Sequence, residues 1–502
     1  MTQTISQTVT QNETDHVDVL VVGAGLSGIG AGCHLQTDAP GTSYEILEAR
    51  GVSGGTWDLF RYPGVRSDSD MFTLGYRFKP WKGSRSIVEG ADILAYLRET
   101  ATEFGVDRKV RYHRKVVGAD WSAQQARWTV TVENTQSGEQ STRTCGFLYL
   151  CSGYYDYEGG HAPTWPGMDS FDGQVIHPQR WPADFDASGK QVVVIGSGAT
   201  AVTIVPALAD AAASVTMLQR SPSYLMPLPA ADPIAGLLRK VLPADKAYRA
   251  TRWKNVRTST AIYEFCQRRP ERAKKILRSL AVKRLPEGFD VDQHFRPTYD
   301  PWDQRMCLVP DGDFFKAVKH GKADVVTDHI EAFEPGGLRL RSGELLEADV
   351  VISATGLELK ALGGVPLSLD GKPVVHAEHV IYKGMMLDGV PNLAFAMGYT
   401  NASWTLKVDL VSSYVSRVIA LMRRRGQDVV TPRLPDAPME RTPFIKMSSN
   451  YFERVRDTLP TQGIAAPWRL VENYRKDATM FLGSVDDGVL QFAKASQLQP
   501  QT

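Results

Sequence analysis

Two apolar runs, each followed directly by a glycine-rich turn, are the clearest pattern in the chain. Asp18–Val22 has the composition of a buried parallel strand, and the turn G-A-G-L-S-G then leads into small and apolar residues spaced as in a helix. Gln191–Ile195 begins a second such unit, with the turn G-S-G-A-T-A. A strand, a glycine turn and a helix in this order bind the pyrophosphate of a dinucleotide at the helix N-terminus. The pattern therefore predicts an α/β protein with two Rossmann-like dinucleotide-binding domains.

Each glycine of the first turn has a predicted task. Gly23 permits the tight turn, Gly25 lets the backbone approach the pyrophosphate, and Gly28 lets helix and strand pack closely. The next strand, Tyr44–Leu47, ends in Glu48, whose carboxylate can accept hydrogen bonds from the adenosine ribose. We expect FAD at this first site. The second unit, described next, is predicted to bind a nicotinamide cofactor, and the hydride that such a cofactor delivers needs an acceptor.

The second unit differs from the first at the end of its next strand. Ser214–Leu218 leads to Arg220 instead of an acid. A guanidinium can pair with a 2′-phosphate through two charge-assisted hydrogen bonds, so the site is predicted to prefer NADPH over NADH. The alternative for Arg220 is a solvated surface charge. The residues predicted on the NADPH side are Gly196, Ser197, Gly198, Thr200, Ala201 (in place of the third glycine), Arg220 and Ser221.

A helical pattern with many basic residues follows the second unit, from Ala230 to Gly288. Its central part, Arg239 to Arg284, contains 15 Lys or Arg against 3 Asp or Glu, a net charge of +12. We interpret the segment as a helical insertion with either an ordinary polar face or a surface that attracts anionic lipid or steers NADPH. Peripheral membrane contact is therefore one expectation. Nucleic-acid binding is not expected, because no recognisable binding motif is present.

Further apolar runs set the predicted domain boundaries. Phe147–Cys151 and Ala348–Gly356 would each close one sheet, the latter in an A-T-G turn, and Asn392–Met397 adds another strand. The loop Gly398–Trp404 would line the flavin or substrate cavity, with packing of Trp404 in a core as the equal alternative. We assign residues 1–165 and 385–502 to the FAD domain, 166–229 and 289–384 to the NADPH domain, and 230–288 to the insertion.

Composition narrows the class of protein further. At roughly 150 residues per domain, 502 residues, 43% of them apolar, predict two to four domains with large cores. A net charge of +1 gives no global reason to expect an acidic partner. The five cysteines are scattered without a C-x-x-C, which predicts neither a disulfide framework nor a zinc site and favours a cytoplasmic setting.

The N-terminal 15 residues look like a loose polar tail. The apolar run Val192–Leu218 is interrupted by polar residues and a glycine turn, so a strand, turn and helix explain it better than a membrane span.

Two longer motifs resemble signatures of a known enzyme family. Just before the second turn stands Phe171-x-Gly173-x-x-x-His177-x-x-x-Trp181-Pro182. The pattern G-G-x-W, four residues, Y-P-G, three residues, D is matched from Gly54 to Asp68 and includes Trp57. Together they resemble the type I Baeyer–Villiger monooxygenases of the flavin-containing monooxygenase superfamily, and among these the shorter members related to the mycobacterial thioamide-activating monooxygenase. The resemblance extends from about Asp15 to Phe492.

This resemblance implies an enzyme that uses FAD, NADPH and O₂ to insert one oxygen atom into a ketone through a C4a-peroxyflavin, giving an ester or lactone. Oxidation of sulfides is a second expected reaction. It also implies that Arg305 is the catalytic cation and that Asp68 pairs with it, so Asp68 joins Trp57 on the FAD side. A permanently charged guanidinium suits this role. The alternative for Asp68 is a turn-forming residue. Some members have Lys where this chain has Gln304, so the NADPH preference rests mainly on Arg220.

The histidine of the first motif is interpreted as structural. The resemblance implies that Phe171, Gly173, His177 and Trp181 organise the contact between the two nucleotide domains rather than touch substrate. A base or a metal ligand is the alternative for His177. No second His, Cys or carboxylate recurs around it at ligand spacing, so no metal site is predicted.

Three other classes of protein share parts of this pattern. The nearest is an N- or S-oxygenating flavin monooxygenase without Baeyer–Villiger activity, which product analysis would distinguish. A pyridine-nucleotide disulfide reductase is disfavoured because the redox C-x-x-x-x-C after the first unit is missing. A flavin-binding redox sensor would show no NADPH oxidation under air. The sequence sets no expectation for ketone size, regioselectivity or oligomeric state.

Overall fold

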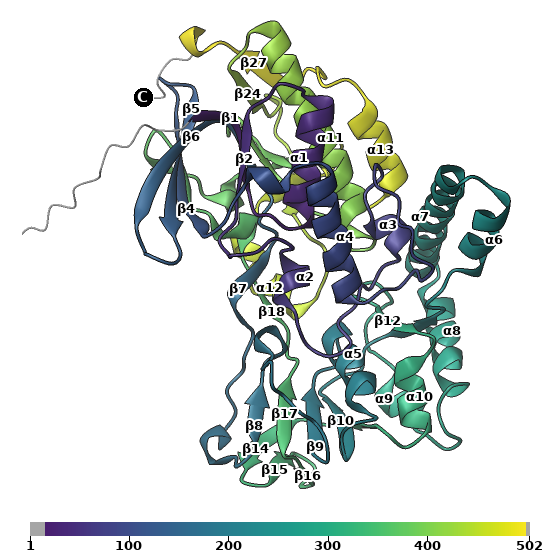
Figure 1. Ribbon diagram of the computed structural model, residues 1–502. Coiled ribbons are helices and arrows are strands. Elements are labelled where there is room, and N and C mark those ends of the chain that lie inside the picture. Colours follow the sequence, from purple (N-terminus) through teal and green to yellow (C-terminus); the bar gives the residue numbers. More distant parts are fainter. Residues whose placement is uncertain (1–15, 498–502) are drawn as a thin grey trace, which may run out of the picture.

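The computed structural model describes residues 16–497, which form two α/β units (Figure 1). The predicted N-terminal tail lies outside these residues. In the upper unit of Figure 1, a nine-stranded sheet has the order β20-β19-β4-β5-β6-β1-β2-β3, and β23 also pairs with β6. Its strands are β1 (His16–Val22), β2 (Tyr44–Leu47), β3 (Val110–Arg111), β4 (Arg114–Ser122), β5 (Arg127–Asn134), β6 (Gln140–Leu150), β19 (Leu367–Leu369), β20 (Lys372–Pro373) and β23 (Leu393–Phe395).

Strand β1 lies inside this sheet, and its burial explains its unbroken apolar sequence. It pairs in parallel with β2 on one side and β6 on the other. Val19, Leu20 and Val21 are fully buried, because hydrophobic side chains cover both faces of the sheet. Helix α1 (Leu26–Asp38) connects β1 to β2, and α4 (Gly90–Glu103), α11 (Trp404–Arg425) and α13 (Tyr474–Leu482) belong to the same unit.

The second unit contains an all-parallel sheet of order β13-β10-β9-β17-β8. The run Val192–Leu218 forms β9 (Gln191–Ile195), α5 (Ala199–Leu208) and β10 (Ser214–Gln219), as its interrupted pattern predicted. The other elements of this unit are β8 (Gln174–Ile176), β11 (Leu225–Leu228), α9 (Val291–His294), β12 (Cys307–Pro310), α10 (Asp313–Lys319), β13 (Asp324–Thr327), β14 (Ile330–Glu334), β15 (Gly337–Leu340), β16 (Leu345–Glu347) and β17 (Val350–Ser353). No helix within residues 16–497 is long and apolar enough to cross a membrane.

A two-stranded connection lies between the two units. Strands β7 (Tyr155–Gly160) and β18 (Leu357–Leu359) pair antiparallel between the upper and lower sheets (Figure 1). Strands β19 and β20 then join the nine-stranded sheet beside β4, ahead of the predicted return at residue 385. We therefore propose that the chain returns to the first unit at β18.

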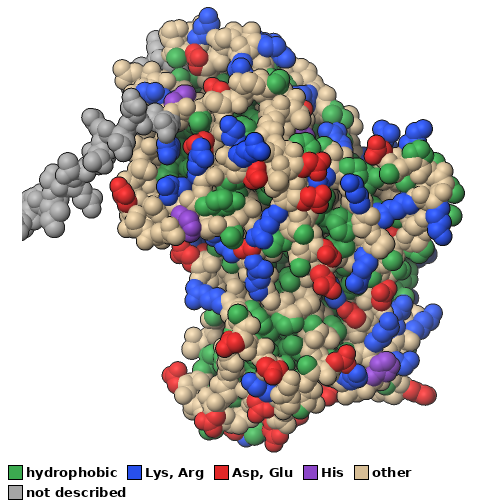
Figure 2. Space-filling view, in the orientation of Figure 1, with side chains coloured by type: hydrophobic (Ala, Val, Ile, Leu, Met, Phe, Trp, Pro, Cys, Tyr) green, Lys and Arg blue, Asp and Glu red, His purple; other side chains and the backbone are tan. Residues whose placement is uncertain are grey.

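Three helices form the predicted insertion, which projects at the right of Figure 1. They are α6 (Pro233–Val241), α7 (Ala244–Arg268) and α8 (Pro270–Val282). Helix α7 is anchored by the buried Arg252, whose guanidinium donates to the carbonyl oxygens of Phe72 and Gly75 at 2.7 Å each. Basic and hydrophobic side chains share the outer surface of α6 and α7 (Figure 2).

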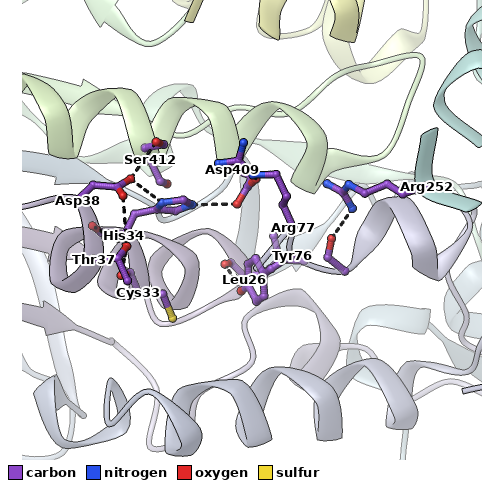
Figure 3. Close-up of polar contacts among 12 residues, drawn as sticks. Leu26, Cys33, His34, Thr37, Asp38, Tyr76, Arg77, Arg252, Asp409 and Ser412 are labelled. Atoms are coloured by element: carbon purple, nitrogen blue, oxygen red, sulfur yellow. Dashed lines mark hydrogen bonds and ion pairs between the residues drawn. The ribbon is translucent and has the colours of Figure 1, made fainter. Parts of the chain in front are cut away.

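A buried histidine, His34, ties α1 to α11 (Figure 3). Nδ1 of His34 lies 3.0 Å from Asp38, and Nε2 lies 2.9 Å from Asp409 on α11. Arg77 lies 3.6 Å from the other oxygen of Asp409. Burial alone would lower the pKa of His34, but the hydrogen bonds to Asp38 and Asp409 raise it to about 9. His34 is therefore a cation at neutral pH that fixes the helix whose N-terminus faces the predicted cofactor.

This cluster predicts a loss of stability between pH 6.5 and about 9. The folded-state pKa of His34 lies above its ordinary value of 6.5, so its contribution is complete below pH 6.5 and lost as pH rises through 9. The loss should be about 3 kcal/mol. We expect the denaturant midpoint of the wild type to fall across this window and that of His34→Gln to start lower and change less. The exposed His320, replaced by Gln, is the control. Equal slopes for wild type and His34→Gln would contradict the assignment.

Candidate active site

The first glycine turn lies against a second glycine pair from the downstream motif. Gly23 has a φ of +100°, Gly25 caps the N-terminus of α1, and Gly54 donates its N–H to the carbonyl of Ala24 at 3.0 Å. A Cβ on Gly55 would stand only 2.9 Å from the Cα of Gly25. At Gly55, beside the open N-terminus of α1, the two backbone segments therefore leave space only for glycine.

Glu48 is placed where the sequence predicted it, but its carboxylate already has partners. It accepts N–H groups from Ala24 at 2.8 Å and from Arg50 at 3.0 Å. Burial raises the pKa of Glu48, while these two backbone donors favour the charged form. Each oxygen has a further lone pair, so a ribose hydroxyl can still be accepted. Arg50 also pairs with the buried Asp58 at 2.5 Å.

The second turn repeats this construction at the end of β9. Gly196 has a φ of +128°, and Gly198 caps α5. Ser197 Oγ donates to the carbonyl of Ser221 at 3.0 Å, which joins the turn to the residues after β10. Arg220 is exposed beside Ser221. Ala201 is fully buried in the core of the second unit, as expected for the position that packs helix against strand.

One cavity of about 1450 Å³ extends along both turns. Its walls include nearly all the residues predicted for the two nucleotide sites: Gly23, Gly25, Glu48, Trp57, Asp68, Gly196, Ser197, Gly198, Thr200, Arg220, Ser221 and Arg305. Gly28 and Ala201 are absent from the walls, since both pack helix on strand. Ser152 and Ser449 also line this cavity, and their buried hydroxyl oxygens have no hydrogen-bond partner among the described residues. Glycine cradles and unpaired polar atoms together fit two dinucleotides.

Arg305 and Asp68 form an ion pair between the two turns. Asp68 follows α2 (Thr56–Leu59), and Arg305 precedes β12, so the pair joins the two units. The Arg305 side chain is 34% exposed, and that surface faces the cavity. The negative charge of Asp68 raises the pKa of Arg305 above its usual value, so the guanidinium stays charged. Burial raises the pKa of the neighbouring Tyr451 to about 12, so this phenol stays neutral.

The interdomain segment lies outside the cavity. His177 Nδ1 accepts the N–H of Gln179 at 3.2 Å, and burial lowers the pKa of His177, which keeps the ring neutral. A Cβ on Gly160 of β7 would lie 2.0 Å from the His177 ring. Phe171 packs on Phe333, with ring centres 5.7 Å apart. A Cβ on Gly173 would meet the carbonyl of Asp349 at 2.3 Å, and Trp181 packs edge-on against Phe185. The organising role of this segment stays a prediction.

Several cavity residues carried no sequence signal. Arg341 and His329 line the same cavity as Arg220, because β13 runs beside β10 and the N–H of Asp328 donates to the carbonyl of Gln219. Tyr154 and Tyr155 also face it. Trp404 does both things that were considered for it: it lines the cavity and packs on Tyr154, with ring centres 5.1 Å apart. The predicted loop Gly398–Trp404 ends there, since Trp404 is the first residue of α11.

Two dinucleotide cradles that share a cavity define the class of two-dinucleotide oxidoreductases. Comparisons with known proteins narrow this class. The model of the family "Flavin-binding monooxygenase-like" matches residues 84–232, and that of the family "NAD(P)-binding Rossmann-like domain" matches residues 21–79. The chain is 52% identical to the FAD-containing monooxygenase EthA of Mycobacterium tuberculosis (strain ATCC 25618 / H37Rv) over 96% of this chain and 98% of that protein. It therefore belongs to the flavin-binding monooxygenase family.

Two further proteins agree with this assignment. MymA of the same M. tuberculosis strain is 48% identical over 96% of this chain and 98% of its own length. A solved structure, oxidized steroid monooxygenase bound to NADP, superposes with a TM-score of 0.76 at 20% identity and covers 96% of this chain and 100% of that one. At this identity the structural likeness concerns the fold, which has two nucleotide domains as the sequence predicted.

Proposed function

We propose that the protein is an FAD-dependent, NADPH-consuming monooxygenase that inserts one oxygen atom of O₂ into ketones, giving esters or lactones, and that also oxidises sulfides. The reaction consumes one ketone, one O₂, one NADPH and one proton, and releases ester, NADP⁺ and water. The observation that carries the proposal is the Arg305–Asp68 ion pair on the wall of a cavity that both nucleotide cradles share. The free, buried cysteines support a reducing, cytoplasmic setting.

The side chains that line the cavity can stabilise charge and shield the reacting atoms from water, while the cofactors supply the redox chemistry. When bound, FAD supplies the electron transfer from NADPH to O₂. Arg305 would supply a permanent positive charge to stabilise negative charge that develops on oxygen, and its ion pair with Asp68 would hold the guanidinium in position. Tyr154 packs on Tyr155 and on Trp404 at the cavity wall, with ring centres 4.5 and 5.1 Å apart, and these apolar rings would limit the access of water to the reacting atoms.

The alternative is an N- or S-oxygenating enzyme without ketone oxidation. A panel of ketones and sulfides, incubated with the flavin-loaded enzyme, NADPH and air, separates the two reactions by product identification. Esters or lactones from ketones support the proposal. Sulfoxides without any ester would assign the alternative, and the absence of NADPH oxidation with every compound would leave a redox sensor or partner protein.

Recognition of the 2′-phosphate is proposed for Arg220, with Arg341 as a second cation on the same wall. Replacement of Arg220 by Ala should raise the Michaelis constant for NADPH roughly 10- to 100-fold and change that for NADH little, because only NADPH loses a charge-assisted bond. Arg341→Ala should act in the same direction. Arg339→Ala is the matched control, since Arg339 pairs with Glu334 at 2.8 Å and does not line the cavity. Equal changes for NADPH and NADH would remove the assignment.

The predicted membrane contact of the insertion is proposed to be separate from catalysis. Residues 224–303 include all of α6, α7 and α8, and none of them lines the cavity. The other expectation for the insertion, steering of NADPH, therefore has no direct support from the cavity walls.

A further inference from the structure

The projecting pair of helices α6 and α7 carries large apolar side chains on its outside. Ile234, Leu237 and Val241 of α6 are 51%, 60% and 66% exposed, and Trp253 of α7 is 61% exposed. The three α6 residues are spaced i, i+3 and i+7, so they share one face of the helix. Opposite this face, Ala235 is buried against Phe72 and Tyr248. Helix α6 therefore contacts the rest of the protein through the small Ala235 and exposes its large apolar side chains to solvent.

The two helices bring these residues to a common level. They form an antiparallel pair, and Lys254 of α7 forms an ion pair with Asp232 at the N-cap of α6. This pairing sets Ile234 near the level of Trp253, while Val241 lies near the start of α7. The exposed apolar residues therefore extend over both helices, and we call α6 and α7 together the lobe (Figure 2).

Cations flank the Trp253 part of this apolar surface on α7. Lys246, Arg249 and Arg257 share one exposed face of α7 with Trp253, at spacings of three and four residues. The Arg257 guanidinium lies 4.6 Å from the centre of the Trp253 ring. None of these three cations has an ion-pair partner among the described residues. Of the three acidic residues between Arg239 and Arg284, Glu264 and Glu271 pair with basic neighbours within the insertion.

We propose that α6 and α7 dock the enzyme on the surface of an anionic phospholipid membrane. Apolar side chains on a helix that lies flat can enter the headgroup region, Trp is favoured at that interface, and flanking Lys and Arg attract anionic headgroups. A second copy of this chain would have to match a surface of the same charge, which opposes pairing of two such faces. Docking here leaves the cavity open to small molecules, because no residue of the lobe forms its wall.

The test measures sedimentation of the flavin-loaded enzyme with vesicles of phosphatidylcholine alone or mixed with phosphatidylglycerol, at low and high salt. We expect binding only to the mixed vesicles and its loss at high salt. Replacement of Lys246, Arg249 and Arg257 together by Gln should weaken binding on the order of 100-fold, at about 1 kcal/mol for each cation. Leu237→Asp should weaken it by tenfold or more.

Matched substitutions elsewhere on the surface make the test specific. Leu482→Asp changes an equally exposed leucine, at 63%, on α13, and the triple replacement of Arg108, Lys372 and Arg424 by Gln removes three exposed cations outside the lobe. These variants should bind vesicles like the wild type. NADPH oxidation must be unchanged in every variant, which checks that each one folds.

Three results would overturn the proposal. The first is the absence of binding to mixed vesicles at low salt, and the second is an equal loss of binding in the control variants. The third is a concentration-dependent dimer, seen by light scattering, that Leu237→Asp abolishes while vesicles have no effect; this result would assign the surface to a second copy of the chain.

Discussion

Replacement of Arg305 by Ala is expected to abolish oxygen insertion while FAD stays bound and can still be reduced by NADPH. The substitution removes the positive charge that faces the cavity and leaves the carboxylate of Asp68 without its partner. An unpaired negative charge would repel the negative charge that develops on oxygen. Removal of one group that stabilises such charge costs about 100- to 1000-fold in turnover, and loss of a full charge should reach the upper end of this range.

Two measurements on the Arg305→Ala variant separate oxygen insertion from the earlier steps. Anaerobic bleaching of the flavin by NADPH reports reduction, which should persist. Ester formation from a ketone accepted by the wild type, compared with NADPH consumed under air, reports insertion, which should vanish while hydrogen peroxide increases. Gln304→Ala is the control, because Gln304 is adjacent and lines the same cavity without a charge. Ester formation at the wild-type rate by the Arg305→Ala variant would refute the role of Arg305.

The sequence predicted the two nucleotide units well because their signals are local. Tyr44–Leu47 and Gln191–Ile195 are strands with the predicted bounds, and each glycine turn contains one residue, Gly23 or Gly196, at a positive φ that only glycine adopts readily. Arg305 and Asp68 are 237 positions apart in the chain. Their proximity followed from a family resemblance rather than from any local pattern, and the ion pair is present in the structure.

Contacts that depend on the arrangement of distant strands had no sequence signal. Arg341 reaches the cavity because β13 lies next to β10, a neighbour relation that spans more than a hundred residues. Strand β19, only three residues long, joins the first sheet beside β4 through parallel pairing, and so short a run carries no clear periodicity. The exposed apolar face of α6 was also missed, since helical periodicity identifies a face but not what covers it.

The tightest steric constraint at the cofactor site gives the second large expected effect, the loss of FAD on replacement of Gly28 by Ala. A Cβ at this position would stand 1.8 Å from the carbonyl oxygen of Gly23. The obstructing atom is backbone, so it cannot move aside as a flexible side chain can. Either α1 or the turn must shift, at a cost of about 3 kcal/mol, and the pyrophosphate cradle would be distorted with it.

Two other glycines serve as controls, because their replacement distinguishes the packing of helix against strand from the approach of the cofactor to the backbone. A Cβ on Gly198 has no neighbour within 4 Å, and one on Gly25 would lie 3.4 Å from the Cα of Gly55. Gly198→Ala should fold normally and keep its FAD, and Gly25→Ala should stay folded but bind FAD weakly. Only Gly28→Ala should lose both the flavin absorbance of the purified protein and several degrees of thermal stability in the apo form. If Gly28→Ala keeps its flavin and its stability, helix and strand do not need this close contact, and the cradle depends on Gly23 and Gly25 alone.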